Sequence, residues 1–171
     1  MNNLFIFFLI FLFSLSIHSK EKLVIYTYDS FISEWGPGPH IKKIFEERND
    51  VEIEFIATES AATLLAKLLL EGKSTKADIV LGLDMNLMQD AIDSQLFEKH
   101  SIKNIYKHLD IPINWENDFF VPYNYGYFAF VYNNKKIKKT PKSMEELIND
   151  SNLTIVIQDP RTSTPGFGLL T

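Results

Sequence analysis

The sequence predicts an α/β fold in two lobes, with a parallel β-sheet covered by helices on both faces in the first lobe and a truncated second lobe. Two observations support this prediction. Short apolar segments alternate with helical patterns from Leu23 onward, and this alternation changes at an aromatic segment that begins near Phe119. Alternating strands and helices are typical of parallel sheets with helices packed on their faces.

The first lobe is predicted over residues 20–121, and its first strand is expected at Leu23 to Tyr28, where β-branched and aromatic residues dominate. The turn at Gly36 to Pro39 leads into a segment whose apolar residues recur at helical spacing. A second strand is predicted at Val51 to Ala57, because apolar residues there alternate with glutamates.

The second half of this lobe repeats the pattern. Ser60 is a good N-cap for a leucine-rich helix that Gly72 closes. The third strand, Asp78 to Leu83, is almost continuously apolar, which predicts a central position in the sheet. A third helix is expected from Asn86 to about Leu96.

The second lobe is predicted to begin after residues 122–131, which read as a strand crossing between the lobes, and to occupy residues 132–171. Ser143 opens a capping box and therefore a helix, and Leu153 to Ile157 reads as a buried strand. The residues after Thr164 are too few for a further helix, and ~40 residues cannot bury a core of their own. We therefore expect a fragment or a truncated reading frame.

Residues 1–19 are predicted to be a secretory signal peptide. Leu4 to Ile17 is almost purely apolar but shorter than the ~20 residues of a membrane span, and Ser19 suits the cleavage site. An uncleaved anchor is the alternative, because Met1 to Asn3 contains no Lys or Arg. The sequence has no Cys, which excludes disulfides and a Cys-linked lipid anchor and favours a soluble periplasmic protein.

Charge and histidine placement exclude two classes of function. The formal net charge is −5 and the lysines are scattered, so nucleic acid is not an expected partner. His40, His100 and His108 follow no metal-ligand spacing, so we expect surface histidines, no metal site and no cofactor.

The loop near the end of the sequence predicts an anion site. Three hydroxyl residues, Thr162, Ser163 and Thr164, precede Pro165, and Pro is favoured at the first position of a helix. Free backbone N–H groups at a helix start, together with hydroxyl groups, bind phosphate or carboxylate. Helix capping alone is the alternative explanation.

Further candidate ligand-binding residues follow from the rule that ligands of open α/β sheets bind at the carboxyl ends of the strands. They are Tyr28, Asp29 and Trp35 after the first strand, Ser60 and Ala61 after the second, and Asp84 after the third. Aromatic faces and carboxylates suit the cationic end of a ligand, while the hydroxyl loop suits a phosphate or hydroxyl end. Packing remains the alternative for the aromatic residues, and capping for Asp29, Ser60 and Asp84.

Five segments carry a family resemblance: Tyr26 to Phe31, Trp35 to Pro39, Lys76 to Asp84, Tyr125 to Tyr132, and Gln158 to Gly166. In this order they resemble the periplasmic thiamine-binding proteins of bacterial thiamine ABC importers. The resemblance implies a type II periplasmic-binding-protein fold. It also implies a monomer that captures thiamine, thiamine phosphate or thiamine diphosphate in an inter-lobe cleft for a membrane permease.

The resemblance also implies particular ligand contacts. The family's phosphate-contacting Ser-Thr pair falls on Ser163 and Thr164. Its acidic-Gly pair at the second helix falls on Ser60 and Ala61, so this sequence lacks a charge and a glycine there. The family's aromatic contacts to the thiamine rings lie mostly beyond Thr171, so we expect binding only from a longer chain.

Three other functions remain as alternatives. A binding protein of the same fold could take ferric iron or a polyamine, and a truncated product could have no function. A thiaminase would need a Cys nucleophile, which the sequence lacks, so we expect no enzyme activity.

Overall fold

The computed structural model describes residues 20–103, 110 and 115–171. The predicted signal peptide at residues 1–19 and His108 lie outside the described residues. Within the described part of the chain, no helix is both long enough and apolar enough to cross a membrane.

The first lobe contains a three-stranded parallel sheet with the strand order β2-β1-β3. The strands are β1 (Glu21–Tyr28), β2 (Val51–Thr58) and β3 (Ile79–Val80). β1 pairs with β2 along its whole length, from Glu21 opposite Val51 to Tyr28 opposite Thr58. The predicted parallel sheet is therefore confirmed.

The predicted central position of the third strand is wrong. β1 is the central strand, and β3 is two residues long and pairs with β1 on one side, at Ile25 and Tyr26. Among the described residues nothing pairs with the other edge of β3. The strand is short because Gly82, with a φ of 110°, turns the chain out of the sheet.

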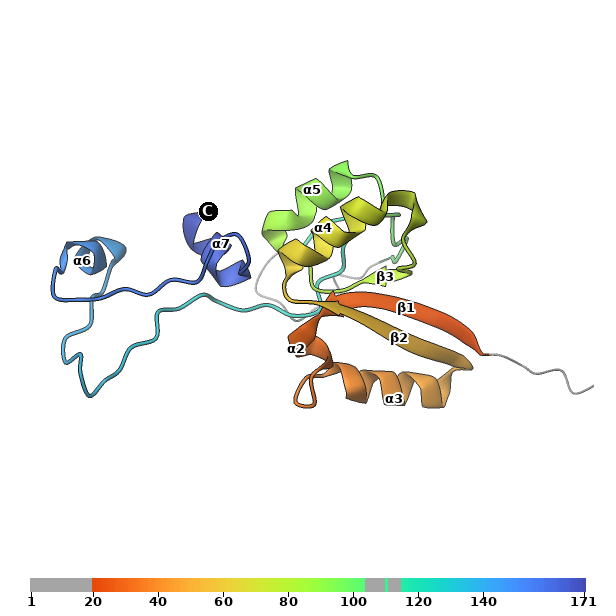
Figure 1. The fold of residues 1–171 in the computed structure, drawn as a ribbon, viewed down its shortest axis with the longest axis horizontal. Helices are drawn as coiled ribbons and strands as arrows, with labels where there is room; N and C mark the ends of the chain where they lie inside the picture. Colours follow the sequence, from red (N-terminus) through yellow and green to blue (C-terminus); the bar gives the residue numbers. More distant parts are fainter. Residues whose placement is uncertain (1–19, 104–109, 111–114) are drawn as a thin grey trace, which may run out of the picture.

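Helices cover both faces of this sheet, as predicted (Figure 1). One face carries α2 (Asp29–Ile32) and α3 (Gly38–Arg48), and the other carries α4 (Ala61–Glu71) and α5 (Met88–Asp93). Ser60 and Gly72 flank α4 as the sequence predicts. The predicted helix from Asn86 to Leu96 is shorter, because it starts as the 3₁₀ turn η2 (Met85–Leu87) and ends before Gln95, which has a φ of 57°.

The core lies between the sheet and these helices. Tyr26 of β1 packs against Leu64 and Leu68 of α4, and all three are at most 2 % exposed. On the opposite face Phe31 makes an edge-to-face contact with Phe55 at a centroid distance of 5.9 Å. Burial of such side chains supplies most of the stability of a domain this size. A second 3₁₀ turn, η1 (Gly72–Ser74), follows α4.

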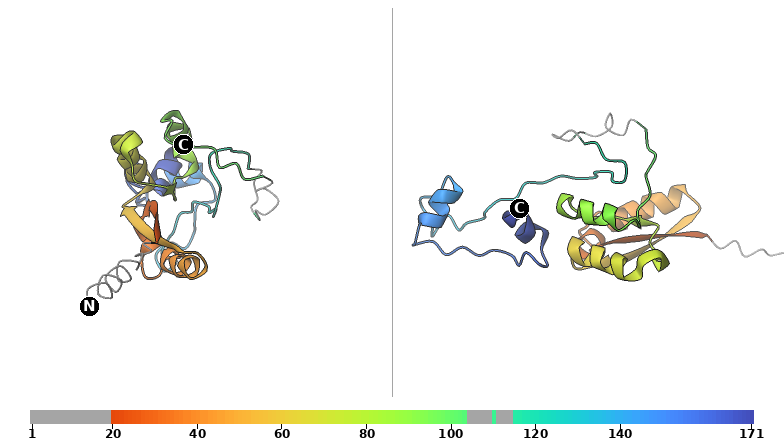
Figure 2. Two further views of the ribbon diagram at one scale, coloured as in Figure 1. Left: turned by 90° about the vertical axis from the view of Figure 1, so that its right-hand side faces the viewer. Right: turned by 90° about the horizontal axis from the view of Figure 1, so that it is seen from above.

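Beyond the first lobe the chain runs through long irregular segments to α6 (Met144–Asn149) and α7 (Thr164–Leu170) (Figures 1 and 2). The predicted strands at residues 122–131 and at Leu153 to Ile157 are absent, because neither segment pairs with a neighbouring strand among the described residues. The final residues, which we expected to be too few for a helix, do form α7. The role of residues 122–131 as the crossing between lobes stays a prediction.

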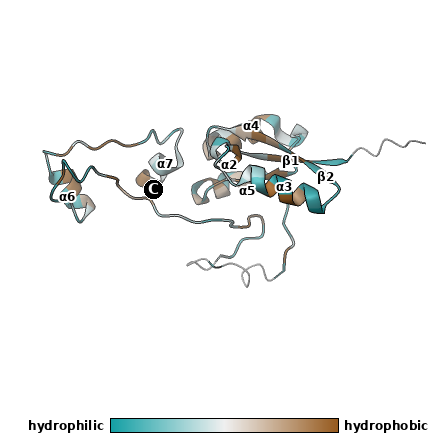
Figure 3. Ribbon diagram, turned by 90° about the horizontal axis from the view of Figure 1, so that it is seen from below, coloured by the Kyte–Doolittle hydropathy of each residue, from teal (hydrophilic) through white to brown (hydrophobic). Residues whose placement is uncertain are grey.

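These two irregular segments are rich in apolar residues, as the brown stretches near α6 and α7 in Figure 3 show. Several of their apolar side chains are exposed. Val131 is 97 % exposed and Val156 is 86 % exposed. The apolar pattern of both segments is typical of buried strands. A strand is buried only when other elements pack on its faces, and in the described residues these two segments remain exposed.

Candidate ligand-binding cleft

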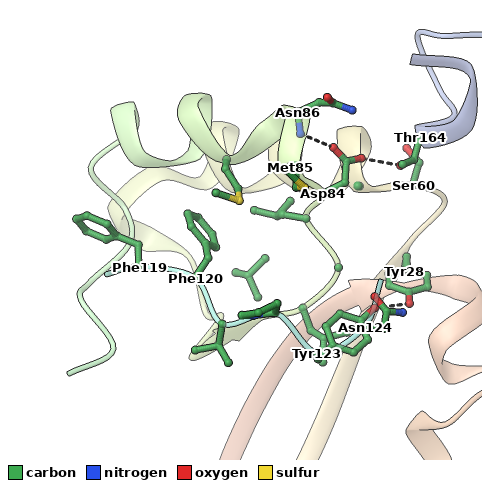
Figure 4. Close-up of a pocket in the computed structure, with 18 of the residues that line it drawn as sticks. Tyr28, Ser60, Asp84, Met85, Asn86, Phe119, Phe120, Tyr123, Asn124 and Thr164 are labelled. Atoms are coloured by element: carbon green, nitrogen blue, oxygen red, sulfur yellow. Dashed lines mark hydrogen bonds between the residues drawn. The ribbon is translucent and has the colours of Figure 1, made fainter. Parts of the chain in front are cut away.

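The carboxyl ends of the three strands border an open cleft of about 1590 Å³ (Figure 4). The opposite wall comes from residues 119–128 and from the hydroxyl loop that precedes α7. Sites for small ligands typically measure ~300–1,000 Å³. The cleft is therefore larger than a small ligand needs.

Asp84 joins the two walls. This residue follows β3, where its Oδ1 accepts a hydrogen bond of 2.9 Å from the backbone N–H of Asn86 and so caps η2. Its Oδ2 accepts a hydrogen bond of 2.8 Å from the hydroxyl of Thr164 (Figure 4). Two predicted site residues that are 80 positions apart in the sequence are thus brought into direct contact.

Ser163 is the N-cap of α7. Its Oγ accepts a hydrogen bond of 3.4 Å from the backbone N–H of Gly166 and donates one to Oε1 of Gln158. Gly166 is required by this turn, since a Cβ there would lie 2.5 Å from the carbonyl oxygen of Gln158. The expected helix start after the hydroxyl residues is therefore present, and capping explains one bond of Ser163.

Arg161 of the same loop pairs with Asp159. The guanidinium donates to both carboxylate oxygens, with Nη2 at 2.5 Å from Oδ2 and Nε at 3.0 Å from Oδ1. These hydrogen bonds lower the pKa of Asp159 to about 2. The positive charge of Arg161 is thus paired with a carboxylate of the same loop.

Tyr28 lies at the end of β1 and lines the cleft. Its hydroxyl shares a hydrogen bond of 2.6 Å with the hydroxyl of Tyr123 (Figure 4). The Tyr28 ring lies directly over Gly82, where an added Cβ would come within 2.2 Å of Cδ1. Burial, and secondly the bond to Tyr28, raise the pKa of Tyr123 above its usual value.

Ser60 and Ala61 border the cleft at the start of α4. The Ser60 hydroxyl accepts a hydrogen bond of 3.2 Å from the backbone N–H of Thr63, and the Thr63 hydroxyl accepts one of 3.0 Å from the backbone N–H of Ser60. This reciprocal pair is a capping box. Ser60 therefore caps α4 in the structure. Contacts of Ser60 and Ala61 with a ligand stay a prediction.

Two predicted site residues do not line the cleft. Asp29 is the exposed first residue of α2, and Trp35 is 80 % exposed in the turn before α3. Tyr123 and Asn124, which were not predicted from the sequence, do line the cleft. The aromatic composition of their segment was visible, but an irregular segment has no periodicity that shows which side chains face the sheet.

Two of the histidines considered in the sequence, His40 and His100, are in the described part of the chain. His40 is exposed on α3. The Nδ1 of His100 accepts a hydrogen bond of 3.0 Å from the backbone N–H of Ile102, so Nε2 is the donor to the carbonyl oxygen of Asn117. No group of three or more metal-ligating side chains is found among the described residues.

Comparison with known proteins identifies related sequences. Residues 74–169 match the family described as bacterial extracellular solute-binding protein. The chain is 50 % identical over 153 residues to the thiamine-binding periplasmic protein of Salmonella typhimurium, 89 % of this chain and 46 % of the relative. It is 48 % identical over 155 residues to the protein of the same name from Escherichia coli, 90 % of this chain and 47 % of the relative.

The chain is also similar to a solved structure whose name matches those of these relatives. The structure of a periplasmic thiamin binding protein matches with a TM-score of 0.80 and 49 % identity, over 90 % of this chain and 48 % of that chain. The chain therefore spans about half the length of the curated relatives and of the solved structure that it matches.

Proposed function

The chain belongs to the bacterial extracellular solute-binding proteins, whose match covers residues 74–169, and from this we propose that its protein captures thiamine, thiamine phosphate or thiamine diphosphate. The observation that carries the proposal is the convergence of residues from four segments on one cleft. They are Tyr28, Ser60, Asp84, Ser163 and Thr164. Relatives named for thiamine binding, at 50 % and 48 % identity, support the ligand class.

The chemistry of the cleft suits this ligand. Thiamine carries a permanent positive charge on its thiazolium ring and a hydroxyl or phosphate at the end of a short side chain. The rings of Tyr28 and Tyr123 and the carboxylate of Asp84 provide attraction for a cation. The hydroxyls of Ser163 and Thr164 provide hydrogen-bonding groups for the other end of the ligand.

The proposed setting is transport. The protein would be exported through the segment at residues 1–19, bind its ligand in the periplasm as a monomer, and deliver it to the membrane permease of an ABC importer. In this setting it catalyses no reaction, in agreement with relatives that are named as binding proteins.

Isothermal titration of thiamine into the full-length protein tests the proposal. We expect one-to-one binding with micromolar or tighter affinity. Ferric citrate and putrescine serve as comparison ligands, because ferric iron and polyamines are the alternative ligands for this fold. No heat from thiamine at high micromolar concentration would contradict the proposal, and heat from either comparison ligand would then support the alternative.

A further inference from the structure

We infer that the outer edge of β2 is a latent pairing surface for a second copy of this chain, and that Lys42 and Glu46 of α3 close it. The outer edge is the side of β2 that faces away from β1, the strand with which β2 pairs. This surface lies on the first lobe, and its closure requires no ligand. The inference therefore does not rest on the proposed function.

The outer edge of β2 has the properties of a strand that pairs with another chain. Among the described residues only β1 pairs with β2, so β2 ends the sheet on this side. The strand is eight residues long and rich in β-branched and aromatic residues, which favour pairing. The unpaired N–H and C=O groups of an edge strand are a template for a strand of another molecule. A second copy supplies such a strand, because a two-fold axis lets the same segment pair with itself.

Two side chains of α3 occupy backbone groups in the middle of this edge. The backbone N–H of Ile53 donates a hydrogen bond of 2.7 Å to Oε1 of Glu46. The carbonyl oxygen of Ile53 accepts a hydrogen bond of 2.7 Å from Nζ of Lys42. The two side chains also form an ion pair, with 3.6 Å between Nζ and Oε1. Together they supply one acceptor and one donor to Ile53, as a neighbouring strand would.

The position of these side chains follows from the local structure. Residues four apart lie on the same face of a helix, so Lys42 and Glu46 point in one direction. α3 runs alongside β2 (Figure 1), and only residues 49–50 connect the two elements. Lys42 and Glu46 are partly buried, whereas Lys43 and Glu47 on the next face are exposed. The short connection therefore holds one particular pair of side chains against the edge.

The contact with Ile53 blocks the whole edge. Backbone groups of successive residues in a strand point to alternate sides, so Val51 and Phe55 present theirs on the same side as Ile53. Ile53 lies between them, and a second strand cannot form a continuous ladder without displacing both α3 side chains. Charged side chains that cover an edge strand prevent edge-to-edge association in native proteins. A second copy of the chain thus meets a closed edge.

The double variant Lys42→Ala, Glu46→Ala opens this edge. It leaves the net charge unchanged, and alanine is the best helix former, so α3 is retained. The matched control is Lys43→Ala, Glu47→Ala, which makes the same change at the exposed neighbouring positions of α3. Sedimentation velocity of the full-length protein measures the association constant of a dimer. We expect this constant to rise by about ten-fold in the first variant and to stay unchanged in the control.

Hydrogen exchange of the backbone amides, followed by NMR, locates the effect. In dilute protein the Ile53 amide should exchange about ten-fold faster in Lys42→Ala, Glu46→Ala, because its N–H has lost its acceptor. Glu46→Ala alone should show the same change, and Glu46→Gln, which keeps an accepting oxygen, should not. In concentrated protein the amides of Val51, Ile53 and Phe55 should become protected in the double variant, because a second strand then pairs with them.

The outcomes are distinct. Dimerisation of Lys42→Ala, Glu46→Ala with protected β2 amides supports the inference. Faster exchange at Ile53 without association overturns it, since the opened edge then does not pair. Unchanged exchange at Ile53 also overturns it, because the two side chains then do not hold the edge. Equal association of Lys43→Ala, Glu47→Ala would assign the effect to the loss of charged groups from α3. Failure of the unmodified protein to bind thiamine affects the proposed function alone.

Discussion

The hydroxyl oxygens of Tyr28 and Tyr123 lie 2.6 Å apart and share a hydrogen bond, although 95 positions separate them in the sequence. Both rings also pack edge-to-face against Phe31, at centroid distances of 6.0 Å and 6.3 Å. The end of β1 is thereby attached to the irregular segment that forms the opposite wall of the cleft. This aromatic cluster gives an otherwise open site a fixed wall.

Replacing Tyr123 by Phe is expected to make the protein less sensitive to alkaline pH. The pKa of Tyr123 is raised in the folded state, by burial first and then by the bond to Tyr28. Above about pH 10 the unfolded chain loses this proton while the folded chain keeps it, so the free energy of unfolding falls as the pH rises. Thermal melts from about pH 8 to about pH 11 should show a smaller loss in Tyr123→Phe.

The control for this prediction is Tyr127→Phe, because Tyr127 is 82 % exposed. It should follow the unmodified protein across the same pH range. If Tyr123→Phe and Tyr127→Phe lose stability equally, the folded state does not hold the Tyr123 proton as described.

Replacing Gly82 by Ala is expected to destabilise the protein by about 2 kcal/mol. Gly82 has a φ of 110°, and a Cβ at this position would lie 2.2 Å from the Tyr28 ring. The ring must therefore move, and its bond to Tyr123 is lost. Gly126→Ala is the control in urea unfolding, since a Cβ at Gly126 meets nothing within 4 Å. A similar midpoint for both variants would be evidence against the packing of Tyr28 on Gly82.

Replacing Ser60 by Ala is expected to lower the free energy of unfolding by about 1 kcal/mol. The change removes the side-chain half of the capping box with Thr63, at the start of the helix that carries buried Leu64. Ser143→Ala removes the equivalent cap of α6, which buries no residue, so its effect on denaturant unfolding should be smaller. An equal loss in both variants would show that burial of the helix does not determine the importance of the cap.

Replacing Arg161 by Gln is expected to return the pKa of Asp159 from about 2 toward 3.8, because the largest cause of its lowering is the side-chain hydrogen bond from Arg161. A lowered carboxyl pKa means that the interaction stabilises the folded state above the ordinary pKa and is lost as the pH falls toward about 2. NMR titration of the Asp159 carboxyl carbon measures both values. Arg161→Lys should lie between them, since Lys keeps the charge without the paired donors. A titration near the low value in Arg161→Gln would remove Arg161 as the cause.

The sequence was sufficient to predict β1, β2 and α4 of the first lobe because their determinants are local. Alternation in β2, the Ser60 cap and the Gly72 stop of α4 all depend on residues a few positions apart. The position of β3 could not be predicted in this way, since a continuous apolar segment shows burial on both faces but not the number of paired edges. The strands expected at residues 122–131 and 153–157 are absent for a related reason, because a strand depends on a partner distant in the sequence.

The site could be predicted only in part, because contacts between residues distant in the sequence are not visible in the sequence. Asp84 and Thr164 were both recognisable as candidates from their places after a strand and before a helix, but their hydrogen bond depends on how two distant loops meet. Tyr123 could not be predicted as a site residue, because the contact of its hydroxyl with Tyr28 depends on the fold. Asp29 and Trp35 satisfy the rule for strand ends in the sequence, yet neither lines the cleft, because Asp29 begins α2 and Trp35 lies in the turn before α3.

A crystal structure of the full-length protein with thiamine phosphate is the most direct test of the central claim, that a thiamine-type ligand binds between the strand ends of the first lobe and the hydroxyl loop. We predict electron density for the ligand in the cleft, in contact with Tyr28 and with Asp84 or Thr164. Density for the ligand at a site that none of these residues lines would contradict the account.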